Sequence, residues 1–236
     1  MTSDTPRQAL HRLCAHVLAR RRFAVSGRFG LRAGPAGIAT PSYGEGPETL
    51  RITGPLLVRE DGSDSTRMRI DGSSLRALAT FAGADVDAPF DCGADTPAIG
   101  DPDEPLSLPA PAVAEIAAWL SLAWDVLDAV ISRLGDEERA STIQLWPEHF
   151  DAATTLTLPS SVSVNVGFSA GDGYLPEPYV YVGPWEPDRP GDPAFWNAPF
   201  GASRPRSQLA ESGLDEADSA TAFLEAGIAL LRGGGA

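Results

Sequence analysis

The residue best suited to chemistry in this sequence is His149, which lies between Glu148 and Asp151 in the stretch LWPEHFDAATTL. An imidazole changes charge near neutral pH, so a histidine beside carboxylates can act as a general base, bind a metal ion or form a structural hydrogen bond. Three interpretations stay open: a sheet-face histidine satisfied by Asp151, Asp172 or water, a polar contact for a small molecule, or a metal ligand or general base. Metal sites usually need a second histidine or more carboxylates, so we assign no metal ligand.

Two predicted strands decide where His149 points. In SVSVNVGFSAG the valines alternate with small or polar residues that include Asn165, which is typical of a strand with one buried face. A three-residue loop across LPSS pairs this strand with the one before it, and every even-numbered position then faces the core. The same register places Asp151 opposite Ser169. It also places His149 opposite Gly171, on the face shared by all odd-numbered positions.

The next predicted strand, PYVYVGPW, sends its valines to one face and Tyr179, Tyr181 and Trp185 to the other. If the valines join the core, the aromatic residues join the polar face, and the loop before the strand lets Asp172 reach inward. Aromatic walls, small residues and a few polar groups are typical of small-ligand sites. We therefore predict a ligand-binding face formed by six residues: His149, Asp151, Asn165, Asp172, Tyr179 and Tyr181.

An amphipathic helix is predicted over residues 6–22, because apolar residues recur at helical spacing after Pro6. His11 and His16 lie on this helix about 140° apart in projection, so they cannot bind one metal ion together, and we expect each at the surface or its boundary. The run Arg20–Arg22 could hold an anion, but it is better explained as the C-terminal end of the helix, where cations oppose the helix dipole.

The composition excludes several classes of function. A formal charge of −14 and a pI near 4.5 disfavour nucleic-acid and anionic-membrane surfaces, which require clustered cations. The sequence contains no lysine, so a Schiff base, lysine-bound pyridoxal phosphate and a P-loop lysine are excluded, and no other cofactor is indicated. Two cysteines without metal spacing and a start that lacks an apolar leader predict a cytoplasmic protein. The longest apolar segment contains Glu115, Asp125 and Asp128, so no membrane span is expected.

Three segments in the last third of the chain resemble a bacterial domain-of-unknown-function family. They are LWPEHFDAATTL, VNVGFSAGDGYLPEPYVYVGPW and FWNAPFGA, and they contain the family's W-P-x-H-F-D, G-F-S-x-G-D and E-P-Y-x-Y-V segments, over roughly residues 143–200. The resemblance implies a bacterial protein and supplies no activity. Members often carry His at the position of Glu148, so a ligand pair formed with His149 would be incomplete in this chain.

The patterns together predict an α+β protein, with antiparallel sheet segments packed against three main helices at 6–22, 110–134 and 215–232. Short strands separated by glycine and proline turns argue against a parallel, doubly wound sheet. The proline-rich stretch 96–111 is the best boundary in the chain. It separates an N-terminal lobe of helix and β-meander, 1–95, from a C-terminal α+β lobe, 112–236, although the two can also form one merged domain.

We expect this protein to bind a small molecule or a protein partner on its polar and aromatic sheet face, without catalysis. The alternative is a hydrolase or isomerase-like enzyme in which His149 acts as general base or metal ligand, oriented by Asp151 or Asp172. A third possibility is an acidic protein that captures a basic partner, and this would require a contiguous acidic face.

Overall fold

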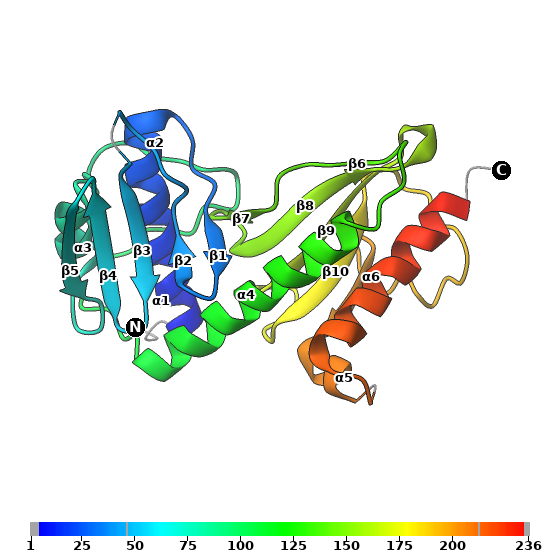
Figure 1. Ribbon diagram of the computed structural model, residues 1–236. Coiled ribbons are helices and arrows are strands. Elements are labelled where there is room, and N and C mark those ends of the chain that lie inside the picture. Colours follow the sequence, from blue (N-terminus) through cyan, green and yellow to red (C-terminus); the bar gives the residue numbers. More distant parts are fainter. Residues whose placement is uncertain (1–4, 46, 212, 234–236) are drawn as a thin grey trace. The chain divides into compact units, whose positions relative to one another are not determined.

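Two compact units, each with an antiparallel sheet, make up the structure, a computed structural model shown in Figure 1. The structure describes residues 5–45, 47–211 and 213–233. The first unit contains Met1–Ser121 and Leu145–Phe150, and the second contains Leu122–Gln144 and Asp151–Ala236. Neighbouring strands in the order of both sheets are antiparallel, so the expected α+β class is confirmed.

A long helical segment opens the first unit. It begins as α1 (Pro6–Leu13), continues as the π-helical stretch η1 (Cys14–Ala19) and ends as α2 (Arg20–Ser26). A capping box of Thr5 with Gln8 starts the segment, and the left-handed conformation of its final cap residue, a glycine with φ of 68°, ends it. The helix therefore continues past residue 22, and the three arginines do not mark its end.

The sheet of the first unit is a meander with the strand order β1-β2-β3-β4-β5. Apolar residues at alternate positions, such as Leu50 and Ile52, are buried in the core of this unit. The helix α3 (Leu75–Ala82) follows the meander with Ser74 as its N-cap. The strands are β1 (Arg32–Gly34), β2 (Gly37–Ala39), β3 (Thr49–Thr53), β4 (Leu56–Asp61) and β5 (Asp64–Arg69).

The proline-rich segment that was expected to connect two lobes lies inside the first unit. Proline lacks a backbone donor but keeps its carbonyl acceptor, so side-chain donors can hold such a segment in place. The division between the units falls instead within α4 (Ala110–Ile131), after Ser121. Two side chains of the opening helix donate to carbonyls of the segment, Arg12 to Ile99 and His16 to Pro97. Four residues further along the helix, Arg20 donates to the carbonyl of Asp85, upstream of the segment.

The sheet of the second unit contains the strand order β11-β10-β9-β8-β6. Its valine face packs against helix α6 (Glu216–Gly233), where a Cβ on Gly227 would come within 2.9 Å of the Val182 side chain. The expected three-residue loop is η2 (Pro159–Ser161), and a short helix, α5 (Arg206–Ala210), precedes α6. The strands are β6 (Arg139–Ala140), β8 (Asp151–Thr157), β9 (Ser163–Ser169), β10 (Tyr179–Pro184) and β11 (Ala202–Pro205).

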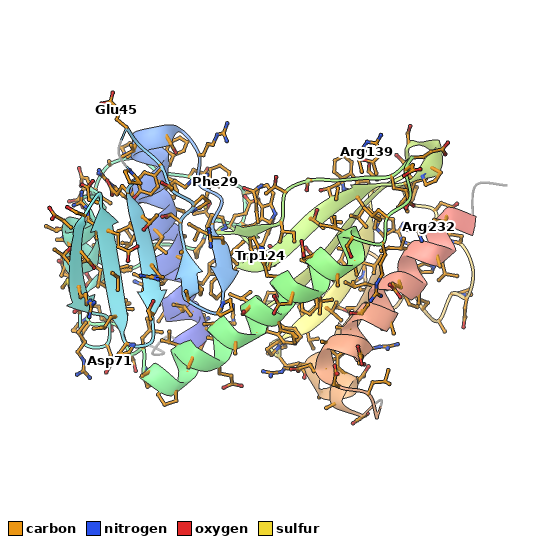
Figure 2. All side chains as sticks on the ribbon, viewed as in Figure 1. Phe29, Glu45, Asp71, Trp124, Arg139 and Arg232 are labelled. Carbon is orange, nitrogen blue, oxygen red and sulfur yellow. The ribbon has the colours of Figure 1, made fainter. Side chains whose placement is uncertain are left out.

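Two arginines of the second unit, Arg139 and Arg232, are labelled in Figure 2. Arg232 on α6 donates two hydrogen bonds of 2.7 Å to the buried carboxylate of Glu138. Arg139 on β6 donates to the backbone carbonyls of Asp136 and Glu138. Across the part of the chain that the structure describes, none of the helices combines the length and apolar character needed to cross a bilayer.

Candidate ligand-binding face

Three strands of the second unit carry the predicted polar face. β8 pairs with β9 in the expected register, with Asp151 opposite Ser169. β9 pairs with β10 so that Tyr181 lies opposite Gly167. A Cβ on Gly167 would come within 2.7 Å of the Tyr181 side chain, so the glycine provides the room that the tyrosine occupies. The predicted alternation is confirmed for residues 151–169.

His149 does not continue this face, and its predicted place opposite Gly171 is wrong. Strand β8 begins only at Asp151, and residues 147–150 form a turn between it and β7 (Gln144–Trp146). His149 also belongs to the first unit, whereas Asp151 belongs to the second. The other five predicted residues all lie in the second unit, so the predicted set loses its histidine.

Phe150 is the physical reason for this turn. Its amide donates to the carbonyl of Trp146 at 2.8 Å, and its backbone has a positive φ of 57°. The ring is fully buried and stacks on His11, with the ring centroids 5.1 Å apart. Burial of a phenylalanine side chain stabilises a fold by about 1.5–3 kcal/mol, which offsets the roughly 1–2 kcal/mol cost of a left-handed residue. A left-handed residue interrupts the alternation of side chains along a strand. The face shared by the odd-numbered residues therefore begins at Asp151 and does not include His149.

The ring of His149 lies between two carboxylates of the first unit. Its Nδ1 is 3.4 Å from Oδ2 of Asp95, and its Nε2 is 3.2 Å from Oε1 of Glu148. The His149 side chain is 50% exposed, so solvent weakens both interactions. These are not the expected partners, Asp151 and Asp172. Asp95 comes from a distant loop, and no local pattern in the sequence connects it with His149.

Asp151 and Asp172 accept hydrogen bonds from the two tyrosines of the face. The Tyr181 hydroxyl donates to Oδ2 of Asp151, whose exposed fraction is only 6%. The Tyr179 hydroxyl donates to Oδ2 of Asp172 at 2.6 Å. The other oxygen of Asp172 accepts from the amides of Tyr174 and Leu175, which shapes the loop before β10. We call Asp151, Ser169, Asp172 and Tyr179 the closed half of the face; Asp172 is half-buried and the other three are buried.

Both phenols remain protonated over the physiological range. Burial raises the pKa of Tyr181 well above its ordinary value, and the Asp151 carboxylate raises it further. Burial likewise raises the pKa of Tyr179, and the hydrogen bond to Asp172 adds to the effect. A phenol that holds its proton is a hydrogen-bond donor and neither a base nor a nucleophile. The tyrosines therefore orient the carboxylates and support the face.

An aromatic cluster joins the closed half to the surface. The ring of Phe200 lies 6.0 Å from that of Tyr181 and 5.1 Å from that of Tyr174, in both cases edge to face. Tyr174 is exposed, and its hydroxyl lies 3.1 Å from Oγ of Ser203 on the edge strand β11. These contacts hold the Tyr181 ring at a fixed position on the sheet.

The remainder of the face is open to solvent and centres on Trp185, which is 65% exposed. The Trp185 amide donates to the carbonyl of Ser163 and so continues the β9–β10 ladder by one position. The indole Nε1 donates to Oδ1 of Asn165 at 3.0 Å, and the hydroxyl of Thr155 donates to the same oxygen at 2.8 Å. We call Thr155, Ser163, Asn165, Gly183 and Trp185 the open half of the face. The alternation of PYVYVGPW already placed Trp185 here, but the predicted set left it out.

The histidines and arginines of the opening helix are structural. His16 is buried, contrary to the expected surface or boundary position, and its Nε2 donates to the carbonyl of Pro97 at 2.6 Å. His11 donates in the same way to the carbonyl of Pro147. Arg22 donates to the carbonyl of Gly30. Burial lowers the pKa of both histidines, so they are neutral donors at neutral pH.

Neither a metal centre nor a known relative supplies the function. Within residues 5–45, 47–211 and 213–233, no group of three or more His, Cys, Asp or Glu side chains is placed to hold a metal ion. Comparison with protein-family models, with curated proteins and with solved structures finds no match for this chain.

Proposed function

We propose that the second unit binds a small molecule or a protein partner on the polar face of its sheet, without catalysing a reaction. The contact residues are those that reach the surface: Asn165, Tyr181 and Trp185. Of the predicted residues of the closed half, Asp151 accepts from Tyr181, and Asp172 accepts from Tyr179. His149 takes no part in this face because it belongs to the first unit.

The observation that carries the proposal is the exposed and fixed indole of Trp185. Its side chain has two rotatable bonds, and the hydrogen bond to Asn165 restricts them before any ligand arrives. A contact residue that is already ordered loses little entropy on binding, which raises affinity. Tryptophan is also the residue type most enriched among those that dominate binding energies. A large aromatic surface held in place among small polar neighbours is suited to recognition.

The closed half supports binding and not catalysis. Its carboxylates each accept a phenolic hydrogen bond, and the phenols hold their protons. A general base needs a reachable proton acceptor near the substrate, whereas the Asp151 carboxylate is buried and already accepts from the Tyr181 hydroxyl.

Thermal-shift measurements test the proposal. The full chain and Trp185→Ala are heated with one panel of neutral sugars, nucleotides, amino acids and basic peptides. We expect at least one class to raise the melting temperature of the parent chain and not that of the variant, because ligands stabilise the folded state to which they bind. His149→Ala is the matched control and should respond like the parent. A panel whose shifts all persist in Trp185→Ala, or that yields no shift, would contradict the proposal.

The alternative, a hydrolase or isomerase-like enzyme, rests on one observation. His149 has Asp95 on one ring nitrogen and Glu148 on the other, and a carboxylate beside a histidine can orient it as a general base. Such an enzyme would use the first unit and a carboxylate other than the expected Asp151 or Asp172. Metal analysis of protein purified without a tag tests whether His149 is a metal ligand. A stoichiometric transition metal that is lost in His149→Ala would favour this alternative.

We further propose a cytoplasmic location without nucleic-acid or membrane partners. The two cysteines, Cys14 and Cys92, are buried free thiols, as is usual for proteins of a reducing compartment. The second unit has 16 acidic residues against six arginines, so its net charge of −10 opposes anionic partners. A filter-binding assay with duplex and single-stranded DNA at low salt should therefore show no retention.

A further inference from the structure

We propose that the ligand of this face is a neutral, polyhydroxylated ring, a sugar or a cyclic polyol, stacked on Trp185. The proposal rests on the binding role argued above and names the chemical class of the ligand. Three features of the open half carry it: an uncharged lining, a pair of outward amide donors, and a space beside the indole.

The open half is uncharged, although the unit around it is acidic. An anionic ligand would be repelled by the net charge of −10, and a cationic ligand would be expected to meet carboxylates where it binds. The two carboxylates of the closed half, Asp151 and Asp172, are already engaged with tyrosine hydroxyls. Uncharged residues occupy the open positions of β8, β9 and β10: Thr155, Thr157, Ser163, Asn165 and Gly183.

Arg139 stands at the far edge of this half. It lies on β6 opposite Thr157, so it shares the face of the odd-numbered residues. Its Nη1 donates to the carbonyls of Asp136 and Glu138, which draws the guanidinium toward its own turn. The charge is thereby held at the rim, away from the indole side of the face.

Asn165 supplies the directional contact. Its Oδ1 accepts from both Thr155 and Trp185, and a carbonyl oxygen has two lone pairs, so this oxygen is saturated. The same two bonds decide which end of the amide is oxygen. The two N–H donors of Nδ2 remain for a ligand, because none of the described residues accepts from them. They select acceptor oxygens, and the neighbouring serine and threonine hydroxyls can both donate and accept, as the hydroxyls of a sugar do.

The space beside Trp185 completes the site. A Cβ built on Gly183 would meet only backbone oxygens, of Phe200 at 3.5 Å and of Asn165 at 3.8 Å. These are ordinary contact distances, so no side chain fills the position above this glycine. The face of an indole carries a partial negative charge and attracts the weakly positive C–H groups of a sugar ring. A ring stacked on Trp185 would place its hydroxyls over Asn165.

Nuclear magnetic resonance on the ¹⁵N-labelled full chain tests the inference. The chain has five tryptophans, and Trp185→Phe identifies the indole N–H signal of Trp185 by its loss. The neutral probes are glucose, galactose, mannose and myo-inositol. Glucosamine and glucose 6-phosphate are matched cationic and anionic controls on the same ring, and a basic peptide and AMP represent the other ligand classes. We expect a neutral probe to shift the Trp185 indole and the Asn165 side-chain amide, and the charged derivatives to shift them less.

Two variants sharpen the result. Asn165→Asp keeps an oxygen for Thr155 and Trp185 but removes both outward donors, so it should weaken neutral-ring binding by about tenfold or more. Trp185→Ala should abolish it, whereas His149→Ala should leave it unchanged. Folding of each variant is checked by the unchanged amide signals of the β8–β9 ladder.

The outcomes separate this inference from the proposed function. If only glucosamine, AMP or the basic peptide shifts the Trp185 signal, the neutral-ring inference is overturned and the binding face stands. If a neutral ring binds equally well to Asn165→Asp, the inference is overturned as well. If no probe of any class moves the Trp185 signal, both the inference and the proposed binding face fail.

Discussion

The two units use polar and charged side chains in different ways. The first unit has 12 arginines against 16 acidic residues, and two of its buried cations, Arg20 and Arg22, donate to carbonyls of irregular backbone. The second unit has half as many arginines for the same number of acids. On its sheet face the polar groups bond side chain to side chain, as Tyr181 does with Asp151.

The difference separates support from recognition. A guanidinium directed at the main chain satisfies acceptors that proline-rich segments leave open, and this role is structural. A sheet face whose side chains bond to one another can still have unused hydrogen-bond donors. Asn165 has two of them, the N–H groups of its side-chain amide. Four predictions test this contrast, in order of decreasing effect.

The largest effect is expected in the first unit at Glu48, which is 7% exposed. It accepts from Arg21 at 3.0 and 2.8 Å and from the hydroxyl of Tyr43 at 2.8 Å. Burial alone would raise the pKa of Glu48, but these bonds outweigh it and lower the pKa. Glu48→Ala leaves a half-buried cation without its partner, so the free energy of unfolding in urea should fall by about 3–5 kcal/mol.

The matched control for Glu48 is the pair of Arg51 and Glu60, whose side chains are 31% and 40% exposed and whose nitrogen and oxygen are 2.6 Å apart. Glu60→Ala should cost about 1 kcal/mol or less, because solvent screens the pair. Equal losses of unfolding free energy in the two variants would show that the buried Glu48 stabilises the first unit no more than this partly exposed ion pair does.

The second prediction concerns the pH dependence of stability through His11. Burial lowers its pKa from 6.5 to about 4 in the folded chain. The histidine is neutral in both states above pH 6.5, so its contribution is fully present there. As the pH falls from 6.5 toward 4, the unfolded chain binds a proton that the folded chain does not, and up to about 3 kcal/mol of stability is lost.

Urea titrations at several pH values between 4 and 7 measure this dependence, and His11→Gln provides the comparison. Glutamine can still donate to the Pro147 carbonyl but does not titrate, so the slope over this range should become shallower. An unchanged slope would mean that His11 is not protected from protonation by the fold.

The third prediction tests the hydrogen bond between Tyr181 and Asp151, a residue of the closed half. Tyr181→Phe removes the hydroxyl that donates to the buried Asp151 carboxylate, and a hydrogen bond to a charged group contributes about 1.5–3 kcal/mol. We expect the free energy of unfolding of the second unit to fall by that amount. Hydrogen exchange of the β8–β10 amides measures the change. Exchange that stays as slow as in the parent chain would contradict a supporting role for this pair.

The smallest effect on stability is expected at the open half. Trp185→Ala removes an exposed ring and one hydrogen bond to Asn165, so the free energy of unfolding should change by about 1 kcal/mol or less. Chemical denaturation measures the change. A loss as large as that of Tyr181→Phe would make Trp185 a structural residue and would remove the contrast between the two halves of the face.

Regular patterns in the sequence predicted much of the fold. The alternation from 151 to 169 and in PYVYVGPW predicted the β8–β9–β10 register and the face of Tyr179 and Tyr181, since a strand with one buried face leaves few alternatives. The two later helices, α4 and α6, begin and end within three residues of the expected positions.

The position of His149 could not be predicted in the same way. The local alternation predicted that the polar face extends to His149, two residues too far. No pattern in the sequence indicates that Phe150 adopts a left-handed conformation and packs on His11. The proline-rich segment is a second case. Its composition indicates a connection, whereas the distant donors Arg12 and His16 hold it within the first unit.

The sequence by itself determined the α+β class, the absence of lysine chemistry and the side chains that share each strand face, because these depend on residue type and short-range periodicity. Only the tertiary structure decided that His149 meets Asp95, that two tyrosines donate to Asp151 and Asp172, and that Trp185 stays exposed beside Asn165. Contacts between residues far apart in the chain depend on how whole elements pack, so the spacing of residues within a short segment does not predict them.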